Sequence, residues 1–479
     1  MTLSLPATMA AKDLSATNCA YDAEDVANHY ALYYGGKSFH ARRDNFVVRR
    51  KIEEGGVGAL SGGQHYADRI KRLAYVNRAG GLIDWVTAAV TRARPPRIVV
   101  GDGVPEETRQ YWESLNDDAT GLGAPLHAVC RQAIREYALY GRGYYYVHFD
   151  SALSVAAEPT TKHAWMRTID PSIAIDWQHD SDKLQWVKLY GVDKIRDAKN
   201  PIGKANKTRH RWTILDDRYV YVYEYIDDKN AFRGGDNIFG EDSEAALVSQ
   251  LPHDFGIPIF PVNALRCNYV MERIYDVVKA LINADLDISY ALAQQAYSQP
   301  VLTLANRSED RISKIIASEA MAVLLDIGET YEYVSPPATA FEPLFKNVER
   351  LKGDLHEVVQ TMSKEAASIP QAGRMSGAAV EAMQSPMDTL LASFAWPHRE
   401  AITNWIAAVK DFRGESQMDI TLEGLDEFDV SDDELKEVLH GSAFEAGDGD
   451  SGRAGTGEAA GTGEAGKGGP EANPIGGAG

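Results

Sequence analysis

Two stretches, 270–297 (VMERIYDVVKALINADLDISYALAQQAY) and 343–367 (PLFKNVERLKGDLHEVVQTMSKEAA), decide how this chain is built. In both, apolar residues recur at intervals of three and four, which predicts two long helices. The apolar stripe of the first is narrow, like the seam of a coiled coil, so we expect a neighbouring copy of the chain to cover its second flank. The predicted seam consists of Ile274, Val278, Leu281, Ile288, Leu292, Val348, Leu351 and Leu355.

The segments around these helices follow a distinct order. Residues 298–336 lie between the helices and predict a small β-α-β module, with strands at VLTLA and VLLDIGETYEYV and a helix at SEDRISKIIASEAMA. Residues 368–377 (SIPQAGRMSG) predict a loop, because proline, glycine and small polar residues interrupt the helix. A third long helix is expected over 378–410, with kinks at Pro386 and Pro397.

Upstream, residues 21–264 predict a mixed α/β region. Helices are expected over 21–35, 65–94, 105–118 and 124–140, the second interrupted at Gly80-Gly81. Short runs rich in Tyr, Trp, Val and Ile follow, and their alternation predicts an antiparallel meander between residues 144 and 227. Strands are also expected at RIVV (97–100) and GIPIFPVNA (256–264). The fold class expected is therefore α+β and mainly helical.

The C-terminal part of the chain differs from its body in composition, and both ends are expected to be flexible. The 479 residues carry a net charge of −20, and −13 of this falls after residue 414. Residues 415–440 predict one strand and one short acidic helix, and 441–479 a disordered tail rich in Gly, Ala and Glu. Residues 1–20 are expected to be flexible, with neither a leader peptide nor a membrane span.

The sequence offers no catalytic signature. Three cysteines without a CxxC pair argue against a disulfide scaffold and a cysteine zinc site. Gly36-Lys37-Ser38 resembles the end of a phosphate-binding loop, but Ala31 stands where that pattern needs a glycine. The acidic balance argues against a wide basic face for nucleic acid. We therefore expect no enzymatic activity, no cofactor and no bound metal.

In its order of parts the chain resembles the portal proteins of tailed double-stranded DNA bacteriophages. The resemblance covers about residues 65–412. It is carried by YVNRAGGLIDWVTAAVTRARPPRI, GRGYYYVHFD, IPIFPVNA before the first long helix, and TMSKEAASIPQAGRMSGAAVEAM after the second. These are patterns of family type, and the recognition depends on their order more than on any one of them.

The resemblance implies a role for each part of the chain. Residues 21–264 would form the wing, 270–297 and 343–367 the stem helices, 298–336 the clip, 368–377 the tunnel loop and 378–410 the kinked helix below the crown. The tunnel-loop residues facing DNA would be Gln371, Gly373, Arg374, Met375 and Ser376. The crown would be reduced, since only a short acidic helix and a Gly-rich tail remain for it.

The resemblance also implies partners and a location. About twelve copies would form a ring at one capsid vertex of the virion, after assembly in the host cytoplasm. Double-stranded DNA would pass through the ring during packaging and ejection. The clip would dock the terminase large subunit and then a head-completion adaptor, while the major capsid protein or a scaffold would surround the ring. No membrane partner is expected.

Charge along the expected channel agrees with such a conduit. Residues 270–368 hold 15 acidic and nine basic residues, a net charge of −6 per copy, so the channel would repel DNA rather than hold it. Two alternatives remain open from the sequence. One is another phage head component, such as an adaptor or minor capsid protein. The other is a soluble enzyme with an aromatic pocket in the β-rich region.

Overall fold

The structure analysed is a computed structural model of the chain. Contacts divide the chain into Met1–Gly441 and Ser442–Gly479, and every residue described below belongs to the first unit. The described residues are 3, 5–18, 21–50, 53, 66, 67, 69–149, 162–180, 183–195, 207–227, 243–253, 256–263, 269–295, 299–303, 330–334, 341–368 and 386–428.

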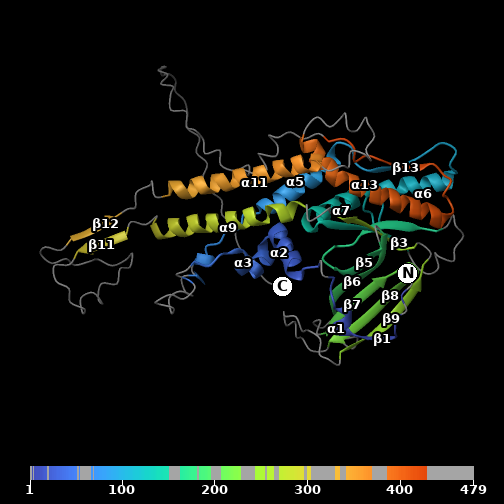
Figure 1. The fold of residues 1–479 in the computed structure, drawn as a ribbon, viewed down its shortest axis with the longest axis horizontal. Coiled ribbons are helices and arrows are strands. Elements are labelled where there is room, and N and C mark those ends of the chain that lie inside the picture. Colours follow the sequence, from blue (N-terminus) through green and yellow to red (C-terminus); the bar gives the residue numbers. More distant parts are fainter. Residues whose placement is uncertain are drawn as a thin grey trace, which may run out of the picture. The chain divides into compact units, whose positions relative to one another are not determined.

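A six-stranded antiparallel sheet forms the β-rich part of the unit (Figure 1). Its strand order is β1-β9-β8-β7-β6-β5, so β5 to β9 follow one another as a meander. This was predicted for β5 to β8, whereas β9 lies beyond the predicted stretch, which ends at residue 227. Alternate residues face opposite sides: Trp212 and Tyr223 belong to one apolar cluster, and Leu215 and Val220 to another. The strands are β1 Thr8–Ala10, β5 Ala174–Asp180, β6 Lys183–Ile195, β7 Lys207–Leu215, β8 Tyr219–Asp227 and β9 Glu244–Pro252.

The prediction of a flexible N-terminus was wrong for most of residues 1–20. β1 pairs with β9, and α1 (Ala11–Leu14) buries Leu14 against the sheet cluster that contains Trp212. The hydroxyls of Tyr221 and Tyr223 donate hydrogen bonds to the carbonyls of Leu3 and Pro6. The segment is too short for a visible apolar period, and its order comes from the sheet face that it covers.

Two smaller sheets join parts of the chain that are far apart in sequence. β3 (Arg142–Phe149) lies between β10 (Ile259–Asn263) and β4 (Ala164–Thr168), all antiparallel. β3 was expected within the meander, but its partner β10 follows more than 100 residues later, which only the tertiary structure decides. The predicted RIVV strand is β2 (Arg97–Val100), and it pairs with β13 (Ile420–Glu423).

Helices pack around these sheets close to the predicted positions, except that the single helix expected over 65–94 was wrong for residues 71–77, which are not helical, so that α5 begins only at Arg78. They are α2 Ala23–Tyr34, α3 Gly36–Phe46, α5 Arg78–Arg92, α6 Glu106–Asp117 and α7 Leu126–Tyr140. The sequence did not indicate α3, which follows α2 after Gly35, a glycine with φ 61°, and buries only Phe39 and Phe46.

The interruption predicted at Gly80-Gly81 was also wrong. Both glycines lie inside the first turn of α5, where the Asn77 side chain accepts a hydrogen bond from the Gly80 amide and caps the helix. The same Asn77 side chain donates to the carbonyl of Tyr33 at the end of α2. Gly80 is therefore a point of close helix contact and not a helix breaker.

The three long helices appear where the sequence placed them. They are α9 Val270–Gln295, α11 Glu342–Ser368 and α13 Pro386–Arg413, of which α9 and α11 run side by side in Figure 1. Pro386 starts the described part of α13, and Pro397 lies inside it. β11 (Gln299–Thr303) pairs antiparallel with β12 (Thr330–Val334), within the predicted β-α-β module. The predicted helix of this module and the acidic helix and tail after residue 428 fall outside the described residues.

Candidate functional site: the paired long helices and their basic groove

The predicted seam is largely buried within one copy of the chain. Ile274, Val278 and Leu281 of α9 are buried, as are Val348, Leu351 and Leu355 of α11, while Ile288 packs against the same core. The core around them includes residues of α5 and α7. The expectation that a neighbouring copy must cover this seam was therefore wrong for these residues. α9 also buries Val270, Met271, Ile282 and Leu286, so its apolar stripe is wider than the spacing suggested.

The distal part of the helix pair retains exposed apolar side chains. Leu292 of α9 is 39% exposed, and Phe345 of α11 is 49% exposed. At 100° per residue, Phe345 lies about 140° round the helix from Arg350, and Leu292 lies about 140° from Asp287. Both apolar side chains thus face away from the charged groove described next.

A groove of about 490 Å³ runs along the outer face of α9. Its floor includes Ala280 and Ala284, one helical turn apart. One wall comes from α11 and the other from the segment that follows α3. The lining residues are Val48, Arg49, Arg50, Arg69, Asp276, Lys279, Ala280, Asn283, Ala284, Asp287, Asn347, Arg350 and Leu351.

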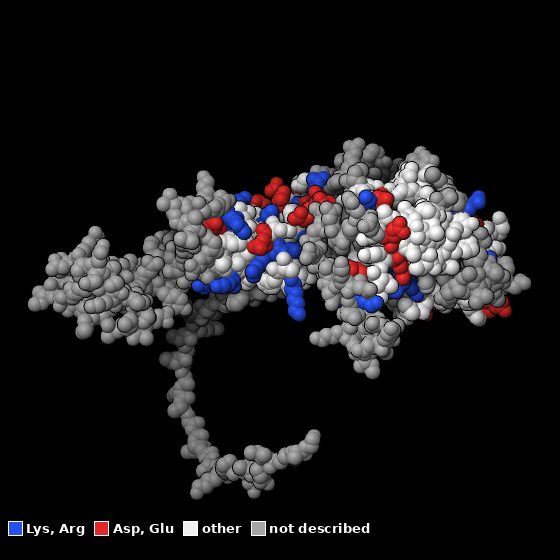
Figure 2. Space-filling model, turned by 90° about the horizontal axis from the view of Figure 1, so that it is seen from below, with Lys and Arg blue, Asp and Glu red and all other residues white. Residues whose placement is uncertain are grey.

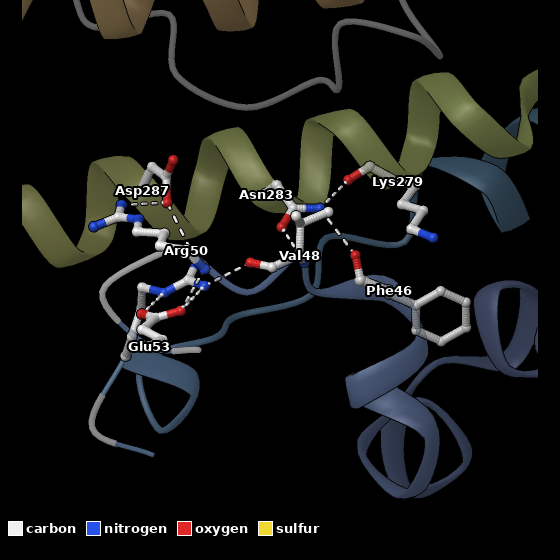
Figure 3. Close-up of polar contacts among 8 residues, drawn as sticks. Phe46, Val48, Arg50, Glu53, Lys279, Asn283 and Asp287 are labelled. Atoms are coloured by element: carbon white, nitrogen blue, oxygen red, sulfur yellow. Dashed lines mark hydrogen bonds and ion pairs between the residues drawn. The ribbon is translucent and has the colours of Figure 1, made fainter. Parts of the chain in front are cut away.

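Asn283 fixes the segment after α3 to α9 (Figure 3). Its side-chain oxygen accepts a hydrogen bond from the amide of Val48 at 2.9 Å. Its side-chain nitrogen donates to the carbonyl of Phe46 at 2.9 Å and to that of Lys279 at 2.7 Å. Both hydrogens of this amide are used, so one side chain holds the backbone of the segment on both sides of Val47.

A buried ion pair also supports the groove wall formed by the segment after α3. The guanidinium of Arg69 binds the carboxylate of Glu53 in a bidentate pair of 2.7 and 2.8 Å, with side-chain exposures of 1% and 3%. Burial alone would raise the pKa of Glu53, but hydrogen bonds from Arg69 and from the Arg50 amide, with the Arg69 charge, hold it below its usual value. Arg69 also donates to the carbonyl of Val48. The buried ion pair therefore holds the backbone of this segment in place at Val48.

The groove carries more positive than negative charge. Five of its lining residues are basic and two are acidic, and Arg50 pairs with Asp287 at 2.6 Å. Arg49 stacks over the ring of Tyr66 at 4.6 Å. Arg49 and Lys279 have no carboxylate partner within the part of the chain that the structure describes. Lys and Arg side chains also gather near the middle of the face drawn in Figure 2.

None of the motifs or patterns in the sequence predicted this groove. The sequence feature that could have indicated it is the local positive charge of residues 36–50. This stretch has five basic residues and one acidic residue, although the whole chain has a net charge of −20. The predicted tunnel-loop residues Gln371, Gly373, Arg374, Met375 and Ser376 lie outside the described residues.

Other polar groups in the described residues are structural in position. His398 of α13 is fully buried, with its Nδ1 2.8 Å from the hydroxyl of Tyr145, and burial lowers its pKa to about 3. Among the described residues, no group of three or more His, Cys, Asp or Glu side chains is arranged to hold a metal ion. None of the described helices has the length and apolar character to cross a bilayer.

Comparison with known proteins gives a weak structural likeness. No family model matches the chain, and no curated protein matches it. In fold the chain is similar to a chain of a solved structure described as "Neck of empty GTA particle computed with C6 symmetry". The match covers 78% of this chain and 88% of that one, with 11% identity and a TM-score of 0.34.

Proposed function

We propose that the chain is a portal-type subunit of a phage head–tail connector, which forms a closed ring for the passage of double-stranded DNA and has no catalytic role. The observation that carries the proposal is the order of its central elements. α9 and α11 lie side by side, the antiparallel pair β11 and β12 falls between them in the sequence, and α13 follows. At 1.5 Å per residue, each of these two helices is about 40 Å long, which suits a stem around a channel.

The exposed apolar side chains at the distal end of the pair support self-assembly. The chain's own core leaves Leu292 and Phe345 uncovered, while it buries the neighbouring seam residues. Head-to-tail contacts between unlike surfaces generate rings when the rotation closes. We assign Leu292 and Phe345 to the contact between adjacent copies in such a ring.

The size of the assembly tests the proposal. Mass photometry or negative-stain imaging of the full chain should show annular particles of about 0.6 MDa, about twelve copies of 52.6 kDa. Phe345→Asp should reduce the ring fraction, because it places a charge in the apolar contact. The control Lys346→Asp changes the adjacent residue, which is 75% exposed and outside that contact. A monomer or dimer at micromolar concentration would contradict the proposal.

The tunnel-loop assignment has a separate test. Deletion of residues 370–376 should leave the ring intact but reduce the amount of DNA packaged, because the loop would lie at the constriction. Ring imaging and DNA content of particles measure the two effects independently. Normal filling by the deletion variant would show that the loop is not the DNA-facing element.

A further inference from the structure

The groove on α9 is an open, fully built surface that the proposed function does not use. One wall, the segment after α3, is held on α9 by the Asn283 hydrogen bonds and the buried pair of Arg69 and Glu53, and α11 packs directly on α9 to form the other, so the groove exists before any partner arrives. Val48, at its edge, is 60% exposed and apolar. A rigid groove with basic walls, a floor of small residues and an apolar rim suits an acidic amphipathic segment.

A phosphate backbone suits the groove less well. Asp276 and Asp287 are among its lining residues and would face any phosphate bound there. Ala280, Ala284 and Val48 also offer apolar surface that a phosphate cannot use but an apolar side chain can. The mixture therefore favours a peptide with both carboxylates and apolar residues.

The chain itself contains such a peptide, directly after the last described residue. Residues 429–439 read DVSDDELKEVL, with five acidic residues and one lysine, a net charge of −4. Leu435, Val438 and Leu439 are spaced three and four apart, and on a helix they would form one apolar stripe. Asp432 and Glu434 would flank that stripe on its two sides, as the basic walls flank the alanine floor.

We propose that the acidic segment 429–439 docks in the α9 groove, with its apolar stripe on Ala280 and Ala284 and its carboxylates against Arg49, Lys279 and Arg350. The contact gives carboxylate partners to Arg49 and Lys279, which have none among the described residues. It also attaches the acidic segment to the long helices. This docking does not depend on whether the helices line a channel.

Zero-length carbodiimide cross-linking of the full chain tests this contact. The reagent joins an amine directly to a carboxylate, so Lys279 should become linked to an acidic residue of 429–439, as identified by mass spectrometry of the digested protein. The double variant Arg49→Glu, Arg350→Glu keeps Lys279 but reverses two wall charges, and we expect loss of the link. The matched control Lys346→Glu reverses an exposed charge of α11 outside the groove and should retain it.

A second double change provides the rescue. Adding Asp432→Lys and Glu434→Lys to the wall variant restores opposite charges across the contact, so a link should return, now between the introduced amines at positions 432 and 434 and the introduced carboxylates at positions 49 and 350. Mixing isotope-labelled and unlabelled copies tells whether the segment comes from the same copy or a neighbour, and either origin supports docking. Thermal unfolding of each variant excludes general loss of structure.

Two results would overturn the inference. One is an absence of the Lys279 link in full-length protein that cross-links elsewhere. The other is binding of a duplex oligonucleotide, followed by fluorescence anisotropy, that depends on Arg49 and Arg350 and is unaffected by deleting 429–439. Mass photometry on the same samples tests ring formation separately. If the protein forms rings but shows no Lys279 cross-link, the docking of 429–439 is contradicted and the proposed function is not.

Discussion

At the scale of single residues, Gly80 and Gly81 show how neighbouring glycines can have opposite roles. A Cβ on Gly80 would lie 2.5 Å from the side-chain Nδ2 of Asn77 and 2.8 Å from the Tyr33 carbonyl oxygen, whereas none of the described atoms would lie within 4 Å of a Cβ on Gly81. We expect Gly80→Ala to destabilise the protein by about 1–3 kcal/mol through overpacking. Gly81→Ala should stabilise it by about 0.5–1 kcal/mol, since alanine restricts the unfolded chain and favours helix.

Thermal or urea unfolding of the two variants measures this difference. The two changes are chemically identical and one residue apart, so each is the control for the other. Equal effects on the unfolding midpoint would show that the close contact between α2 and α5 at Gly80 does not constrain the helix.

The buried side chain of His398 makes the free energy of unfolding depend on pH. Burial lowers its pKa to about 3 from the ordinary 6.5, so the unfolded chain takes up the proton first as the pH falls. The stability contributed by the neutral imidazole is therefore complete above pH 6.5 and is lost towards pH 3, at about 1.4 kcal/mol per pH unit.

The variant His398→Asn isolates that contribution. It should be less stable than the wild type at pH 7.5, because it leaves a cavity beside Tyr145. At pH 5 the difference in unfolding free energy should shrink by about 2 kcal/mol, since only the wild type loses stability through this group. Parallel pH profiles for the two proteins would be the contrary result.

At the scale of elements, the N-terminal segment closes one face of the six-stranded sheet. Leu14 is 1% exposed and lies in the cluster with Trp212 and Tyr223. Leu14→Ala should cost about 2–5 kcal/mol and shift tryptophan fluorescence to the red on partial opening of this face. Lys12→Ala, an exposed change in the same short helix, is the control and should have little effect. A stability equal to that of the wild type would contradict the packing role of α1.

Element prediction from sequence succeeded where a period was long and failed where order depended on distant partners. The apolar spacing of Ile274, Val278 and Leu281 predicted α9 well, because a period repeated over many turns is a strong signal. β1 and α3 were missed, since one has three residues and the other buries only Phe39 and Phe46. The groove was missed for a related reason: its two walls come from segments about 300 residues apart.

At the scale of the whole molecule, the last residues of the chain should not contribute to assembly. The 40 residues after Leu439 are dominated by Gly, Ala and Glu and contain no apolar period that would offset the entropy of ordering. Truncation after Leu439 should therefore leave the particle mass, corrected for the deleted residues, unchanged in mass photometry. A smaller oligomer after this truncation would assign the tail a place in the contact between copies. Truncation after Phe428 is a different experiment, because it also removes the acidic segment proposed to dock on α9.

The sequence by itself determined the long helices, the antiparallel meander and the uneven distribution of charge. Each of these depends on side chains a few residues apart, whose spacing is fixed by helix or strand geometry. Only the tertiary structure decided that the predicted seam is covered within one copy, that β2 pairs with β13 and that Arg49 and Lys279 line one groove with Arg350. These features join segments hundreds of residues apart, and their free energy comes from burial and ion pairing that no local pattern encodes.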